Sequence, residues 1–154
     1  MIHLTPEQHV FVTERHVATL TTLRPDGTPH VVPVAFTWDP ATGVARMTSE
    51  DGSTKVRNVE AVQGRGPATA ALAGAGAVAT GTATGTGARG ALCQVSGGRW
   101  LTLEGELTVS RDPAVIVDAE RRHAVRYGPL DPDPRRVVLR LVVDRVLGSE
   151  YMTR

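Results

Sequence analysis

The first third of the chain carries the pattern of a β-hairpin whose second arm is interrupted by proline. Residues 16–23 and 28–38 are rich in Val and Thr, and residues 24–27 join them with the turn sequence Arg-Pro-Asp-Gly. In such a turn proline presets φ and glycine accepts a positive φ. Pro29 and Pro33 cannot donate to a hydrogen-bonded ladder. The second arm is therefore either a strand that leaves room for a ligand against its backbone or an ordinary edge strand.

Strand and helix patterns alternate through the rest of the chain. Further strands are predicted over residues 44–49, 91–95, 99–110 and 137–147. Helical segments are predicted after the capping pair Thr5 and Gln8, over residues 54–61, and from the cap Asp112 to about Tyr127. About six strands with two peripheral helices predict a mainly β domain, folded as a closed or nearly closed antiparallel barrel.

Residues 66–88 interrupt this pattern with a segment that has no charge, six glycines and five threonines. It is too rich in glycine for a convincing helix and too weakly apolar to span a bilayer. We therefore predict a flexible low-complexity insertion within a single domain that covers residues 1–154.

The bulk composition excludes several classes of function. The net charge of +1 gives no nucleic-acid-binding face, and the five histidines show no spacing typical of metal ligands. Cys93 is the only cysteine, which excludes an internal disulfide and suits a reducing cytosol. Its apolar neighbours predict a buried side chain. No export signal or membrane-spanning segment is recognised, so a cytoplasmic location is expected.

Residues 48–58 hold the only lysine of the chain, Lys55, among hydroxyls and a glycine. They lie between a predicted strand and a predicted short helix. Backbone N–H groups at a helix start, hydroxyl donors and a point charge on a long side chain are the components of a phosphate site. The alternative is a solvated polar turn. The stretch is not a P-loop, because the earlier glycine is missing and Val56 follows the lysine.

No catalytic triad, dyad or metal motif is recognised elsewhere. Arg121, Arg122 and Arg126 are predicted to form a solvated helix face, and Arg135 with Arg136 is either a salt-bridge pair or an anion contact. If the protein is an enzyme, the difficult chemistry belongs to a bound cofactor. From the residues alone, the prediction is a cofactor-binding β-barrel.

Several stretches of the chain together resemble a known family. Residues 15–34, 52–58 and 99–105 resemble the split β-barrel oxidoreductases related to pyridoxamine 5′-phosphate oxidase, in the branch that uses the deazaflavin coenzyme F420. Within that branch the chain is most similar to the reductases of biliverdin. That similarity is carried by residues 92–95, 118–120, 126–127, 134–138 and 145–149. The charge-free insertion departs from the family pattern, and would lie beside the groove as a mobile lid or a free segment.

The resemblance implies a homodimer with two F420 sites at its interface. It implies that the cofactor phosphate is held by Ser53, Thr54, Lys55, Arg57 and Asn58. It further implies that the deazaflavin lies against Pro33 and Val34, that Thr48 and Ser49 line the same groove, and that Trp100 of the second subunit forms a wall.

The reaction implied by the resemblance is hydride transfer from reduced F420 to an organic acceptor, with biliverdin reduced to bilirubin as the leading expectation. Arg99 and Arg135 are candidates to bind the propionates of that substrate or to steer a proton. Two alternatives stay open: an FMN-dependent oxidase or reductase on the same barrel, and a non-catalytic carrier that binds F420 or a tetrapyrrole.

Overall fold

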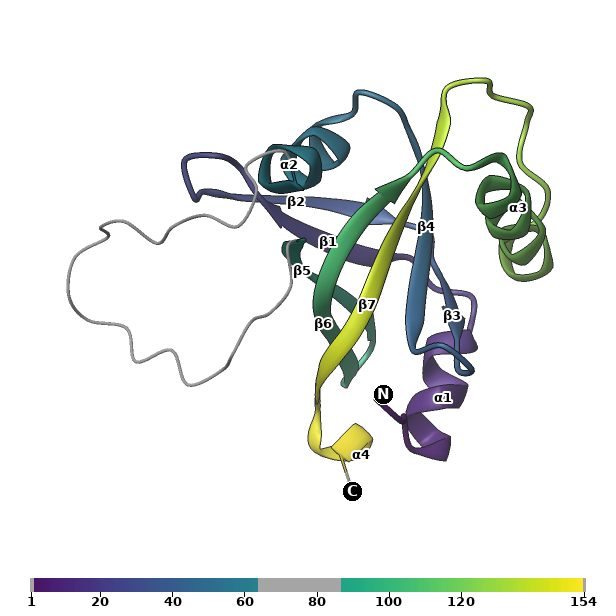
Figure 1. Ribbon diagram of the computed structural model, residues 1–154. Helices are drawn as coiled ribbons and strands as arrows, with labels where there is room; N and C mark the ends of the chain where they lie inside the picture. The colour runs from purple at the N-terminus through teal and green to yellow at the C-terminus, as the bar shows by residue number, and fades with distance from the viewer. Residues whose placement is uncertain (1, 64–86, 154) are drawn as a thin grey trace.

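The computed structural model describes residues 2–63 and 87–153 (Figure 1). Most of the predicted insertion at 66–88 therefore lies outside the described residues. The strands in the described part are β1 (Ala18–Leu23), β2 (Pro29–Val34), β3 (Thr37–Asp39), β4 (Val44–Glu50), β5 (Ala88–Ser96), β6 (Arg99–Ser110) and β7 (Arg136–Gly148). The helices there are α1 (Pro6–Thr13), α2 (Thr54–Gln63), α3 (Pro113–Tyr127) and α4 (Glu150–Thr153).

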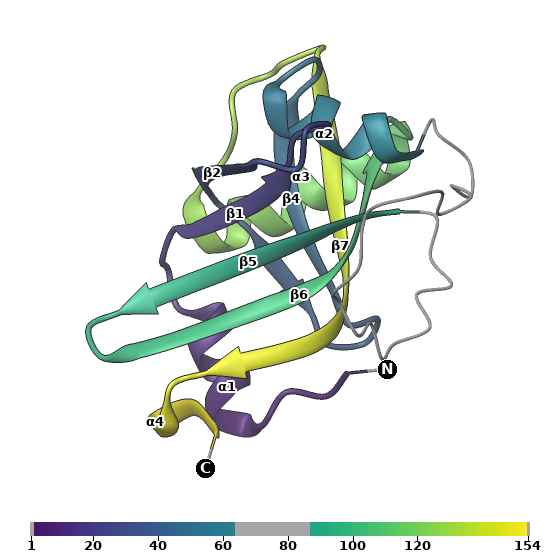
Figure 2. The same ribbon diagram turned by 90° about the vertical axis from the view of Figure 1, so that its left-hand side faces the viewer.

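The strands form one antiparallel sheet in the order β2-β1-β5-β6-β7-β4-β3. Figures 1 and 2 show this sheet strongly curved, with the long strands β6 and β7 crossing its middle. The predicted mainly β, split-barrel fold is confirmed. A closed barrel is not confirmed, because β2 and β3 are the two edge strands of the sheet and do not pair with each other in the described part.

The sequence predicts about six strands and two peripheral helices, and the described part has seven strands and four helices. Residues 28–38 do not form one strand but divide into β2 and β3 around Phe36. The hydroxyl of Tyr127 lies 3.4 Å from the Phe36 backbone N–H and 3.1 Å from its carbonyl oxygen, and Arg126 donates to that same oxygen. Side chains of α3 thus occupy the backbone groups that a continuous ladder would use.

The core fills the concave side of the sheet. The strand predicted over residues 99–110 is confirmed as β6, and burial alternates along it: Leu101, Leu103 and Leu107 are buried, while the intervening polar residues face outward. Between Glu104 and Gly105 the pairing with β7 shifts by a bulge. A Cβ at Gly105 would stand 2.0 Å from the Val142 carbonyl oxygen, so only glycine permits this approach of the two backbones.

The two predicted helix caps are both confirmed. Thr5 and Gln8 form a reciprocal capping box on α1, with bonds of 3.2 and 3.0 Å. Asp112 caps α3 by accepting the Ala114 N–H at 2.9 Å. α3 packs on the outer side of β3, β4 and β7, whereas α2 contacts β1, β5 and β6. None of the helices in the described ranges combines the length and apolar character needed to cross a bilayer.

Two predictions about burial were wrong. Cys93 is only half-buried, because it lies between Thr19 and Thr102 on the convex face of the sheet. Arg126 is not a solvated residue, because it is half-buried and stacks over the rings of Phe36 and Tyr127, at 4.4 and 4.9 Å from their centroids.

Candidate cofactor site

The anchor loop, residues 50–53, turns the chain from β4 directly into α2. Gly52 has a φ of +76°, which favours glycine, and the Ser53 N–H donates to the Glu50 carbonyl at 3.2 Å. The Ser53 carbonyl accepts the Arg57 N–H at 2.9 Å, so Ser53 is the residue from which α2 starts. The first N–H groups of a helix have no acceptor one turn earlier and carry the positive end of its dipole. This loop therefore presents a local anion-binding geometry.

Hydroxyl groups gather at this helix start, as the sequence predicts. The Oγ atoms of Ser49 and Ser53 lie 3.1 Å apart, which joins the end of β4 to the start of α2. Thr54 is the first residue of α2, and its Oγ1 accepts a bond of 3.1 Å from Arg57. Thr48 lies one residue before Ser49 on β4 and is half-buried. Four of the predicted site residues thus lie on the continuous segment that runs from the end of β4 to the start of α2.

Lys55 is half-buried on the first turn of α2. Burial lowers the pKa of its ammonium group, and the negative charge of Glu50 opposes this effect. Among the described residues, none of the ion pairs within 4.0 Å includes Lys55. A desolvated cation without a carboxylate partner is what a bound phosphate would compensate. The residues at this turn therefore fit a phosphate-bearing cofactor.

Arg57 and Asn58 differ from the other predicted phosphate ligands. Arg57 is exposed and folds back onto the loop, with bonds of 2.9 Å to the Gly52 carbonyl and 3.1 Å to Thr54. Asn58 is 5% exposed, and its Nδ2 donates to Thr22 Oγ1 at 3.0 Å. The structure therefore places Asn58 behind the site, where it fastens α2 to β1.

We expect Asn58→Ala to destabilise the protein by about 1–3 kcal/mol, because Thr22 keeps a buried hydroxyl without its partner. Urea unfolding of the variant beside wild type measures this change. If stability is unchanged while F420 affinity is lost, Asn58 is a cofactor ligand and this structural assignment is wrong.

His30 is a candidate site residue that sequence reasoning missed, because its imidazole lies close enough to Lys55 for that charge to act on it. It lies on β2 opposite Thr22, and its buried Nδ1 has no hydrogen-bond partner in the described part of the chain. Burial lowers the pKa of His30, and the positive charges of Arg24 and Lys55 lower it further. Its place in the alternation of β2 is the signal that could have identified it, since the spacing of the histidines carries no such information.

The pKa of His30 supplies a test of anion binding beside Lys55. In the free protein, positive neighbours disfavour the imidazolium form. A bound phosphate offsets those charges and favours that form, so we expect the pKa of His30 to rise when F420 binds. NMR titration of the imidazole with and without F420 measures the shift. A pKa that stays the same or falls would place the anion elsewhere.

Pro33 and Val34 lie on opposite faces of β2. Pro33 is exposed, whereas Val34 is 7% exposed and belongs to the core, so Val34 offers mainly its backbone to a ligand. Next to the β1–β2 ladder, the Arg24 N–H donates to the Thr28 carbonyl, so Arg24 and Thr28 are a hydrogen-bonded pair. By strict alternation Pro29 and Pro33 then fall at non-hydrogen-bonded positions, with their nitrogens facing away from β1. β2 is an edge strand, and its prolines cost it no bonds to β1.

Trp100 is not brought to this turn within one chain. β6 begins at the end of the sheet away from α2, as Figure 1 shows. The indole is 39% exposed on the convex face, opposite Val95.

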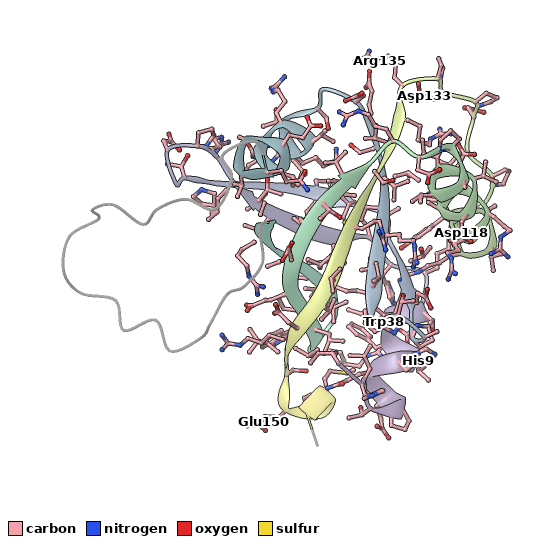
Figure 3. All side chains as sticks on the ribbon, in the orientation of Figure 1. His9, Trp38, Asp118, Asp133, Arg135 and Glu150 are labelled. Carbon is pink, nitrogen blue, oxygen red and sulfur yellow. The ribbon has the colours of Figure 1, made fainter. Side chains whose placement is uncertain are left out.

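The two arginines suggested for substrate binding are both paired. Arg99 holds Glu14 through bonds of 3.0 and 2.9 Å. Arg135 contacts Glu50 at 2.5 Å and the Asp51 carbonyl at 3.0 Å, and Figure 3 shows it on the loop just before β7. Arg135 therefore braces the anchor loop. The neighbouring Arg136 pairs with Glu120, which supports the salt-bridge reading of both residues.

Arg111 is a second brace that sequence reasoning missed. It makes two bonds to Asp51, of 3.0 and 2.7 Å, and an ion pair of 2.6 Å to Glu60 on α2. Arg111 lowers the pKa of Asp51 and keeps that carboxylate charged. The anchor loop and α2 are thus tied to the end of β6.

Comparisons with known proteins show the family of this chain. Residues 4–149 match the family model described as pyridoxamine 5′-phosphate oxidase. A relative from Mycobacterium tuberculosis (strain CDC 1551 / Oshkosh), the F420H2-dependent biliverdin reductase, is 41% identical over 95% of this chain and 88% of its own.

Solved structures share the fold at lower identity. One is a conserved hypothetical protein of Mycobacterium tuberculosis, with a TM-score of 0.67 and 18% identity over 97% of this chain and 86% of that chain. Another is an F420 reductase, with a TM-score of 0.59 and 21% identity over 90% of this chain and 94% of that chain. With a family match across nearly its whole length, this chain belongs to the pyridoxamine 5′-phosphate oxidase family.

Proposed function

We propose that this protein is an oxidoreductase that uses reduced F420 to reduce biliverdin to bilirubin. The 41% identical relative is named for this activity and aligns with 95% of the chain. The single structural observation that carries the proposal is the half-buried Lys55 on the first turn of α2, which forms no ion pair within 4.0 Å with a described carboxylate, while the nearby Glu50 is paired with Arg135. A cofactor phosphate supplies the missing negative charge.

The cofactor, when bound, supplies a hydride from its reduced deazaflavin. In this proposal Lys55 pairs with the phosphate, while Ser49, Ser53 and Thr54 offer hydroxyls to it. The exposed edge of β2 at Pro33 offers a flat surface for the ring system. These contacts position the cofactor and do no chemistry themselves.

We assign the proton that accompanies the hydride to solvent. Arginine is a poor acid, and both suggested arginines already bind carboxylates: Arg99 binds Glu14 and Arg135 binds Glu50.

A homodimer is part of the proposal, and the convex face of the sheet is its proposed interface. Val31, Val95 and Trp100 are 56%, 57% and 39% exposed on that face. Figure 2 shows β5 and β6 toward the viewer, and none of the described helices lies in front of them. An apolar sheet face of this kind is typical of a protein interface. Pairing two such faces would bring Trp100 of one subunit toward a site on the other.

The lone Cys93 fits a cytoplasmic location.

Turnover tests the proposal directly. Protein, reduced F420 and biliverdin are mixed, and the oxidation of F420 and the appearance of bilirubin are followed spectroscopically. We expect both, in equal amounts and in proportion to enzyme. Binding of F420 and biliverdin without turnover would make the protein a carrier, and turnover with reduced FMN alone would make it a flavin enzyme.

A further inference from the structure

The α1–α3 cleft is a cavity of about 590 Å³ that the cofactor site does not use. Its walls come from α1, β3 and α3, and include Thr37, Trp38, Arg121, Arg122, Val125 and Arg126. In Figure 3, Trp38 lies between His9 on α1 and Asp118 on α3. The volume is within the range of small-molecule sites.

The charge around this cleft is not balanced. Arg121 and Arg122 both bind Asp118 at 2.7 Å, and Arg122 also lies 3.6 Å from Asp39. Arg46 reaches the same Asp39 at 3.1 Å. With Arg126, four guanidinium groups stand against two carboxylates. The excess positive charge favours an anionic occupant.

Arg126 is the arginine of the cleft that forms no ion pair with a described carboxylate. It is half-buried and donates to the carbonyls of Glu14 and Phe36 and to Gln94 Oε1, all of them neutral acceptors. Burial lowers the pKa of its guanidinium. Its hydrogen bonds to described residues use four of its five N–H donors.

The cleft also offers surfaces for a planar body. Trp38 contributes to its lining although the residue is only 8% exposed, and the buried indole Nε1 has no hydrogen-bond partner in the described part of the chain. β3 follows β2 after only Ala35 and Phe36, so the cleft begins close to the strand edge proposed to carry the cofactor ring. Arg126 binds the Phe36 carbonyl in that same connection.

We propose that the α1–α3 cleft binds the carboxylates of a planar conjugated acceptor. The inference rests on the proposed function for the identity of that acceptor, a bilin with two propionates. Guanidinium groups bind carboxylates in matched geometry, and the exposed part of Trp38 would contact the conjugated body.

The test uses Val125, which lines the cleft and is 88% exposed, so a charge there is tolerated by the fold. In Val125→Glu the new carboxylate lies one helical turn from Arg121 and Arg122 and competes for them. We expect the dissociation constant for biliverdin to rise about five- to tenfold at low salt in cofactor-free protein. Val125→Lys should bind as tightly as wild type or more tightly.

Val10→Glu is the matched control, because Val10 is 59% exposed on α1 but does not line the cleft. It should bind biliverdin like wild type, and all three variants should bind F420 like wild type. Equal affinity of Val125→Glu and Val10→Glu for biliverdin, or no biliverdin binding by wild type, overturns the inference. Loss of turnover in every protein, including wild type, would instead overturn the proposed function, while the binding comparison still decides the cleft.

Discussion

Lys55→Ala is expected to weaken F420 binding by roughly 1.5–3 kcal/mol, the scale of a hydrogen bond to a charged group. This corresponds to a dissociation constant roughly 10- to 150-fold higher. The ammonium lies on the first turn of α2 and has no carboxylate partner among the described residues, so its charge is available to the phosphate. Removing it should leave the fold intact, because no salt bridge is broken. Fluorescence titration with oxidised F420 measures the change.

Arg89→Ala is the matched control for this experiment. It also removes one positive charge, but Arg89 is exposed and pairs with Asp144 on β7. The control should bind F420 like wild type, which separates a local contact from an effect of net charge. An unchanged dissociation constant in Lys55→Ala would make the anchor loop an ordinary solvated turn.

Val95→Asp is expected to dissociate the proposed dimer. Val95 is 57% exposed on the convex face and pairs with Trp100 across the hairpin. A charge at the centre of an apolar interface costs about 2 kcal/mol or more, which raises the dimer dissociation constant by at least roughly 30-fold. Analytical ultracentrifugation measures this shift. F420 affinity should fall as well, because the second subunit no longer completes the site.

Val117→Asp provides the comparison, because Val117 is 63% exposed on α3, which packs against β3, β4 and β7 and not beside Val95 on β5. It should leave the sedimentation behaviour and F420 affinity unchanged. A Val95→Asp protein that sediments as the same species as wild type would move the interface to another surface. A wild-type protein that is monomeric while binding F420 tightly would contradict the dimeric site.

Local patterns predicted most of the elements. The alternation over residues 99–110 defined both faces of β6, and the caps at Thr5 and Asp112 marked two helix starts. Each of these signals lies within a few residues of what it determines. The break between β2 and β3 could not be predicted in this way. It depends on Arg126 and Tyr127, which reach Phe36 from α3.

In the candidate site, too, the residues that are neighbours in sequence could be predicted, and those with distant partners could not. Lys55 and the hydroxyls near it are neighbours in sequence, so their gathering at a helix start follows from local reasoning. Asn58 and Arg135 were harder to interpret, because their partners Thr22 and Glu50 become neighbours only in the folded chain. A polar residue beside a motif therefore cannot be assigned to the ligand until its own partners are known.

A side-by-side binding titration with F420 and FMN tests the central claim most directly. Both cofactors carry a phosphate for Lys55, so the comparison isolates the choice of ring system and tail. We expect tight, saturable binding of F420 that depends on Lys55, with FMN binding weaker by tenfold or more. Tighter binding of FMN, or no binding of F420, would contradict it.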